Sequence, residues 1–271
     1  MVSEKRIQGL SLKVGPLGEN DRLLTVLTEK EGIIRIAIPG ARRPKSSLAA
    51  AVPLTLIDLQ VVGRRELKRV KQMKVLRSFT KLGQRIETLA AAQAITELTL
   101  MVAVNNDPQL KILETVIIHL GRLEEVDKGE ESQILILAKI VQCCVHLLAL
   151  GGYSIPVHRC SRSGINLEPP LGNWDWCCSL IPEEGFAIGA IPNSVLQLNP
   201  SELALLQRLF QPNLPFNKEG TLLGPQKVWL KLLAVIECWA EHHLPKRIRS
   251  LEMLREVLTI SEIDNNKYLN S

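Results

Sequence analysis

The stretch RIAIPGARRPKSSLAAAVPLTLIDLQV, Arg35 to Val61, contains two segments in which apolar and polar residues alternate. One is RIAIP, which begins at Arg35, and the other is TLIDLQV, which ends at Val61. A period of two is typical of strands that bury one face, because successive side chains point to opposite sides. The stretch therefore predicts two strands of one sheet, joined by a loop that carries Arg42, Arg43 and Lys45.

Three more strand-like segments surround this stretch within the first 80 residues. The five predicted strands are Ile7–Val14, Leu23–Thr28, Ile33–Pro39, Leu54–Val62 and Leu67–Phe79. Glu31-Gly32 makes a plausible tight turn between the second and third strands. Five short strands in so short a segment predict a small closed barrel such as an OB-fold, and an SH3-like barrel fits the same strand count.

The remaining sequence predicts an α+β protein with a helical body. We expect an OB-fold domain at 1–80, a helical domain in two parts at 81–150 and 199–250, an irregular turn-rich module at 151–198, and a tail at 251–271. The most apolar segment, residues 134–150, carries Lys139, Gln142 and His146, which favours a buried core helix over a membrane span. Without an apolar export signal at the N-terminus, we expect a cytoplasmic protein with no membrane partner.

Charge is divided unevenly along the chain. Residues 1–80 contain 16 Lys and Arg against 7 Asp and Glu, whereas the other residues contain 17 against 21. A basic domain on a near-neutral body is typical of binding to nucleic acid, and a solvated surface is the alternative. The predicted phosphate-binding cations are Arg22, Arg35, Arg42, Arg43, Lys45, Arg64, Arg65, Lys68, Arg69, Lys71 and Lys74. On a regular strand Lys68 and Lys74 would share one face and Arg69 and Lys71 the other.

The first aromatic residue of the chain is Phe79. A barrel that stacks bases needs aromatic side chains on its strands. We therefore expect contacts mainly to backbone phosphates, with comparable binding of single and double strands.

The loop GARRPKS, Gly40 to Ser46, also resembles part of a nucleotide-binding loop. That motif needs a second glycine where this chain has Pro44, and proline has no N–H to offer a phosphate. A nucleotide-dependent enzyme using Gly40–Ser46 is thus the weaker alternative, and no catalytic residues stand out. A third possibility is an interaction scaffold without DNA affinity of its own.

The cysteines give an incomplete metal pattern. Cys160, Cys177, Cys178 and His158 are the candidate ligands, but a structural zinc site normally has two C-x-x-C pairs. Serine stands at position 163, where the first pair needs a second cysteine. We therefore expect no bound metal and no cofactor, and a module core held by Trp174, Trp176 and neighbouring apolar residues.

Three segments resemble the bacterial RecO family of recombination mediators. They are the G-E-N-D-R element at Gly18–Arg22, the T-x-x-x-G turn at Thr28–Gly32 and the G-A-R-R-x-x-S loop at Gly40–Ser46, and LLALGGYSIPVHRC (147–160) resembles the start of the family's module. The resemblance implies an OB-fold, a helical body and a zinc-ribbon-like insertion that often has four zinc cysteines.

The resemblance also implies a function in the recombination machinery at the nucleoid. Its members bind and anneal DNA, contact single-strand binding protein and, with a RecR-type partner, help to load the RecA recombinase. An acidic tail of single-strand binding protein would need an apolar groove beside a base. Candidates for that contact are Lys227, Lys231, Lys246 and Arg247, with ordinary surface residues as the alternative.

Overall fold

The computed structural model describes residues 4–46, 48–63, 68–129, 131–192, 194 and 196–268, with side chains described up to residue 258. The chain forms two compact units, Met1–Glu125 and Val126–Ser271. The barrel and the first two long helices belong to the same unit, so the boundary expected after residue 80 lies inside it.

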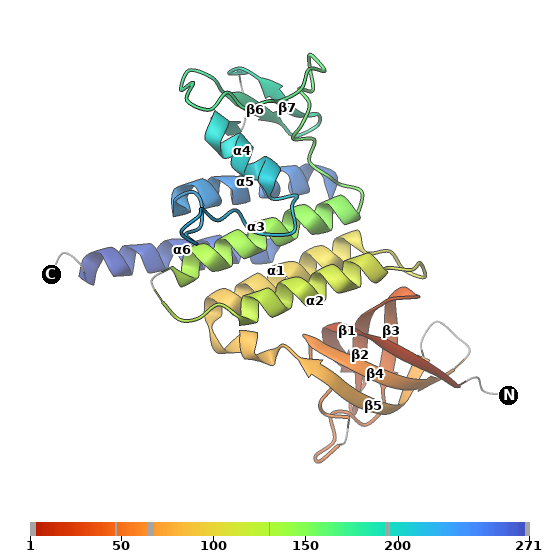
Figure 1. Cartoon of the computed structure of the whole chain (residues 1–271). Helices are drawn as coiled ribbons and strands as arrows, with labels where there is room; N and C mark the ends of the chain where they lie inside the picture. The colour runs from red at the N-terminus through yellow and green to blue at the C-terminus, as the bar shows by residue number, and fades with distance from the viewer. Residues whose placement is uncertain are drawn as a thin grey trace. The chain divides into compact units, whose positions relative to one another are not determined.

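The first unit begins with five strands that close into a barrel in the order β1-β2-β3-β5-β4. Figure 1 labels these strands. The strands are β1 (Glu4–Leu17), β2 (Asp21–Thr28), β3 (Gly32–Ile38), β4 (Thr55–Val62) and β5 (Lys68–Ser78). All neighbours are antiparallel except β3 and β5, which join in parallel through two residue pairs, Ile36 with Lys68 and Ala37 with Arg69. The predicted five-stranded OB-type barrel is confirmed.

Alternate apolar residues fill the barrel. The core cluster takes every second residue of β2, β3 and β4, including Leu24, Val26, Ile34, Ile36, Ile38, Ile57, Leu59 and Val61. This is the period-two pattern of the sequence, read with the apolar side inward. The polar residues between them face outward, and these positions carry the charged surface described below.

The β2–β3 turn fixes the barrel to the loop between the two helices of this unit. Those helices are α1 (Ile86–Val102) and α2 (Leu110–Glu124), preceded by the short helix η1 (Thr80–Gln84). The N–H of Asn106 donates to Glu31 O (3.0 Å), and the N–H of Gln109 donates to Glu29 O (2.8 Å). Gly32 has a φ of +59°, and a Cβ there would collide with the carbonyl of Val104. The turn therefore needs glycine for both its conformation and its space.

The second unit contains the helices α3 (Ser132–Leu150), α4 (Pro200–Arg208), α5 (Gln226–His243) and α6 (Arg249–Tyr268). One face of α5 is apolar and buried, with Trp229, Leu232, Leu233 and Ile236 fully inaccessible. By length and composition α3 is apolar enough to cross a membrane, but 61% of that window is buried inside the protein. This burial agrees with the predicted core helix.

The module at 151–198 contains a small antiparallel sheet in the order β7-β6-β8. Its strands are β6 (Cys178–Ile181), β7 (Gly185–Ile188) and β8 (Leu196–Leu198). Its buried residues include Val157, Leu167, Leu180 and Phe186. The expectation that Trp174 holds this core is wrong, because 81% of Trp174 is exposed. Phe186 on β7 fills the interior instead.

Candidate nucleic-acid interface

The loop after β3 closes one end of the barrel. We call residues 40–53 the capping loop; Ser47 within it lies outside the described part. Ala41 and Ala51 join the barrel core, whereas Arg42, Arg43 and Lys45 are exposed, as predicted. Successive turns, such as Arg43 N–H to Gly40 O (3.0 Å), hold the backbone in a compact form. The loop therefore packs its apolar residues inward and presents its cations to solvent.

The β1–β2 turn fastens the capping loop in place. Asp21 Oδ1 accepts a hydrogen bond from the N–H of Gly40 (2.8 Å). Arg22 Nη1 donates to Ala51 O at 3.1 Å and, more weakly, to Ala49 O at 3.3 Å. The G-E-N-D-R element and the G-A-R-R loop are thus two halves of one structure. Arg22, predicted to bind phosphate, spends part of its hydrogen-bonding capacity on this loop.

The same contacts argue against a nucleotide-binding loop. A phosphate cradle needs several backbone N–H groups that converge on empty space. Here the N–H groups of Gly40, Arg42, Arg43 and Ser46 all donate to other protein atoms. Pro44 has none.

The outer face of the barrel carries a second group of cations. Lys13 on β1 pairs with Thr25 on β2, which in turn pairs with Arg35 on β3. Cross-strand partners share a face, and Thr25 lies between two core residues of β2, so all three point outward. Arg69 extends the group, since its partner Ala37 lies two residues beyond Arg35 on the same face.

We call Lys13, Arg35 and Arg69 the outer cationic row. All three are exposed, and the structure describes no ion pair for them. The sequence prediction included Arg35 and Arg69 but missed Lys13. A register shift between Ser11 and Lys13 turns the lysine outward, and no signal in the sequence marks that bulge.

The expected faces of β5 are wrong because β5 has bulges of its own. Its pairing with β4 shifts between Val70 and Gln72 and again between Val75 and Arg77. An extra residue reverses the alternation beyond it. As a result Arg69 and Lys74 both face outward, whereas Lys68 points toward the open end of the barrel.

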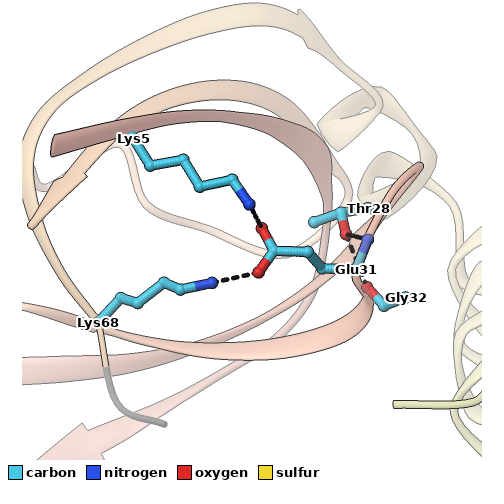
Figure 2. A network of polar contacts seen from close by, with 5 residues as sticks. All are labelled: Lys5, Thr28, Glu31, Gly32 and Lys68. Carbon is cyan, nitrogen blue, oxygen red and sulfur yellow. Dashed lines mark hydrogen bonds and ion pairs between the residues drawn. The ribbon is translucent and has the colours of Figure 1, made fainter. Parts of the chain in front are cut away.

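Lys68 belongs to an ion-pair network at that end (Figure 2). The carboxylate of Glu31, on the β2–β3 turn, bonds to Lys5 Nζ at 2.8 Å and to Lys68 Nζ. Thr28 Oγ1 supports the turn by accepting the N–H of Glu31 (3.1 Å) and donating to Gly32 O (3.0 Å). Burial alone would raise the pKa of Glu31, but hydrogen bonds and charge from the two lysines outweigh it and lower the pKa.

One other predicted cation is held by an acid, and a second lies beside one. Lys71 Nζ lies 2.6 Å from Glu4 Oε1, and Lys74 lies opposite Asp58, whose carboxylate binds Arg6. The Arg6 hydrogen bond lowers the pKa of Asp58. Arg64 and Arg65 lie outside the described residues. Of the predicted cations that the structure describes, Lys68 and Lys71 have ion pairs. No ion pair is described for Arg22, Arg42, Arg43 and Lys45 in and beside the capping loop, for Arg35 and Arg69 of the outer cationic row, or for the exposed Lys74.

The four residues expected to contact a partner's tail do not form one cluster. Lys231 pairs with Glu202 at 2.6 Å, and Arg247 pairs with Glu241 at 3.4 Å. Lys227 stands at the start of α5 and Lys246 lies beyond its end. A helix of this length separates them by about 27 Å.

The candidate metal ligands are not gathered into one cluster in the described part of the module. Among the described residues no group of three His, Cys, Asp or Glu side chains is placed to hold a metal ion. Burial raises the pKa of Cys178 to about 12. Cys160 is buried, and burial would raise its pKa, but hydrogen bonds from Ser163 and from the N–H of Ile188 (3.5 Å to Sγ) lower the pKa to about 7. Cys160 thus accepts hydrogen bonds from Ser163, in the turn that follows it, and from Ile188 at the end of β7. His158 is exposed.

A basic five-stranded OB-type barrel on a helical body is an architecture typical of proteins that bind nucleic acids. Two family models match the chain: "Recombination protein O N terminal" over residues 1–79 and "Recombination protein O C terminal" over residues 83–252. The chain therefore belongs to the RecO family of DNA repair proteins.

Similar proteins cover nearly the whole chain. A DNA repair protein RecO from Prochlorococcus marinus (strain MIT 9303) is 62% identical over 96% of this chain and 98% of its own length. One from Synechococcus sp. (strain WH7803) is 58% identical, covering 98% of this chain and 99% of its own. A more distant one from Trichodesmium erythraeum (strain IMS101) is 31% identical, with 95% and 96% covered. The family membership supports a role in recombination repair.

Proposed function

We propose that this protein is a recombination mediator that binds single- and double-stranded DNA through backbone phosphates, anneals complementary strands and works without catalysis. The observation that carries the proposal is the set of exposed, unpaired cations on an aromatic-free barrel. The capping loop exposes Arg42, Arg43 and Lys45, and the strands of the barrel carry the outer cationic row. Contacts of this kind position a strand without reading its sequence.

Weak, sequence-independent binding suits a protein that must align two strands and then release them. We infer that it acts on strands coated by single-strand binding protein and, with a RecR-type partner, helps to load the RecA recombinase. The site of action is then the cytoplasm, at the nucleoid. The module is expected to fold without zinc, because hydrogen bonds from Ser163 and Ile188 to Cys160 organise the turn that a metal would otherwise hold.

Strand annealing tests the proposal. Complementary oligonucleotides, each coated by single-strand binding protein, should form duplex faster with this protein and without ATP. Reversal of Arg42, Arg43 and Lys45 to Glu should slow annealing and weaken binding to both strand forms. If annealing with the parent protein is no faster than annealing without any added protein, the proposal is contradicted.

A further inference from the structure

The module exposes an unusual pair of apolar side chains on one turn. Trp174 is 81% exposed and Leu171 is 68% exposed, the two highest values among the large apolar residues that the structure describes. Ile165, in the preceding turn of the module, is 55% exposed. A single exposed apolar residue is ordinary, but several in one short segment indicate a contact surface.

This turn is rigid. Pro169 and Pro170 restrict its backbone, and their carbonyls accept the N–H groups of Leu171 (2.9 Å) and Asn173 (3.0 Å). The side chain of Asn173 in turn accepts the N–H of Asp175 (3.2 Å). A tryptophan held on a preformed turn loses little conformational freedom on binding.

The base of the turn is also fixed. Leu167 is buried, and Gln207 of α4 donates to its carbonyl (2.8 Å) and to that of Val157 (2.9 Å). The exposed tip is therefore an extension of the folded module.

Charge separates this surface from the DNA-binding one. Residues 163–207 contain no Lys or Arg, although the whole chain has a net charge of +5. The five acids in this segment are Glu168, Asp175, Glu183, Glu184 and Glu202, and all except Glu202 are exposed. The module's two arginines, Arg159 and Arg162, are exposed and precede this segment. Acidic residues beside the turn repel a phosphate backbone and attract a basic protein surface.

We propose that the turn Pro169–Asp175 is a docking element for a folded partner protein that offers an apolar pocket for Trp174 and a Lys/Arg rim. Tryptophan is enriched among the residues that dominate binding energy at protein interfaces. The flanking Glu168 and Asp175 supply the complementary charge. The docking element contains no residue of the barrel.

The test uses full-length Trp174→Ala and Leu171→Ser variants, with Ile86→Ser as the matched control, since Ile86 is an exposed apolar residue (61%) of the other unit. The probes are purified RecR, RecA and single-strand binding protein, titrated in turn. Trp174→Ala should weaken one of the three about 30-fold or more, the loss expected of an interface hot spot. Glu168→Gln with Asp175→Asn should weaken the same pair less and flatten its salt dependence.

Three outcomes would overturn the docking proposal. Unchanged affinity for all three proteins is one. A loss of DNA affinity in Trp174→Ala would assign the tryptophan to base stacking, and a loss of self-association in sedimentation would assign it to a second copy of this chain. DNA affinity and thermal unfolding are measured on the same preparations. The first shows whether the barrel binds DNA, independently of the docking proposal, and the second shows whether a variant has misfolded.

Discussion

Replacing the outer cationic row is the sharpest test of the DNA-binding surface. The variant Lys13→Gln, Arg35→Gln, Arg69→Gln removes three positive charges that are exposed and have no ion pair in the described part of the chain. None of the three packs in the barrel core, so we expect stability to change little. Any loss of DNA affinity then reports on the surface alone.

The size of the effect follows from counterion release. Each lost phosphate contact lowers the salt slope by about 0.9 for duplex DNA and about 0.7 for single strands, so three lost contacts lower it by about 2.7 and about 2.1. At 0.1 M salt one duplex contact corresponds to about 8-fold in affinity and three to about 500-fold, as an upper limit. Fluorescence anisotropy with labelled oligonucleotides, repeated over a range of salt concentrations, measures both quantities.

Two residues of β5 supply the matched control. Arg69→Gln and Lys71→Gln make the same charge change, but Lys71 is paired with Glu4. We expect about 8-fold from the first and about 2-fold or less from the second. Equal losses from the two single variants would show that total charge rather than the row determines binding. A triple variant with the parent's affinity and slope would show that the row does not contact DNA.

Three further predictions concern the barrel and the module. In Glu31→Gln, Lys5 and Lys68 lose their acidic partner, so the protein should be less stable near neutral pH. Because the pKa of Glu31 is lowered in the folded state, its contribution to stability is present above the ordinary glutamate pKa and disappears as the pH falls through the folded value. Unfolding curves of parent and variant that differ equally at all pH values would contradict this. Gly32→Ala should destabilise the protein by about 1–3 kcal/mol or more in denaturant unfolding, whereas Gly15→Ala, which meets nothing within 4 Å, should not. Treatment with a zinc chelator should leave the thermal midpoint unchanged, whereas Cys160→Ala should lower it; zinc at one atom per chain would refute the metal-free module.

The strands could be predicted from sequence because burial of one face leaves a period-two pattern. The Arg35–Val61 stretch shows this, with Ile36, Ile57 and Leu59 in the core. The family-like motifs at Gly18–Arg22 and Gly40–Ser46 were recognisable too. Their mutual hydrogen bonds were not, since residues about 20 apart meet only once the barrel has formed.

The surface was harder to predict because it depends on register. One extra residue in a strand moves every later side chain to the opposite face. The bulge near Lys71 reversed the expected faces of β5, and the one before Lys13 hid a candidate residue. The ion pairs could not be predicted from sequence either, since Lys68 and its partner Glu31 are 37 residues apart in the chain. Trp174 was misjudged because its apolar character predicted burial, while its rigid turn holds it in solvent.

Net charge alone therefore overstates the DNA-binding surface of this barrel. Glu31, Glu4 and Asp58 each hold cations of the same domain, and these pairs stabilise strand closure. The outer cationic row and the capping loop hold most of the other described cations, with Lys74 on β5 and Lys30 on the β2–β3 turn outside both groups, and the β1–β2 hairpin connects the row with the loop. Lys13 lies four residues before the end of β1, about 13 Å along the strand, and the turn that follows holds Gly40 through Asp21. Because one hairpin positions both groups, we expect them to form a single path for a phosphate backbone.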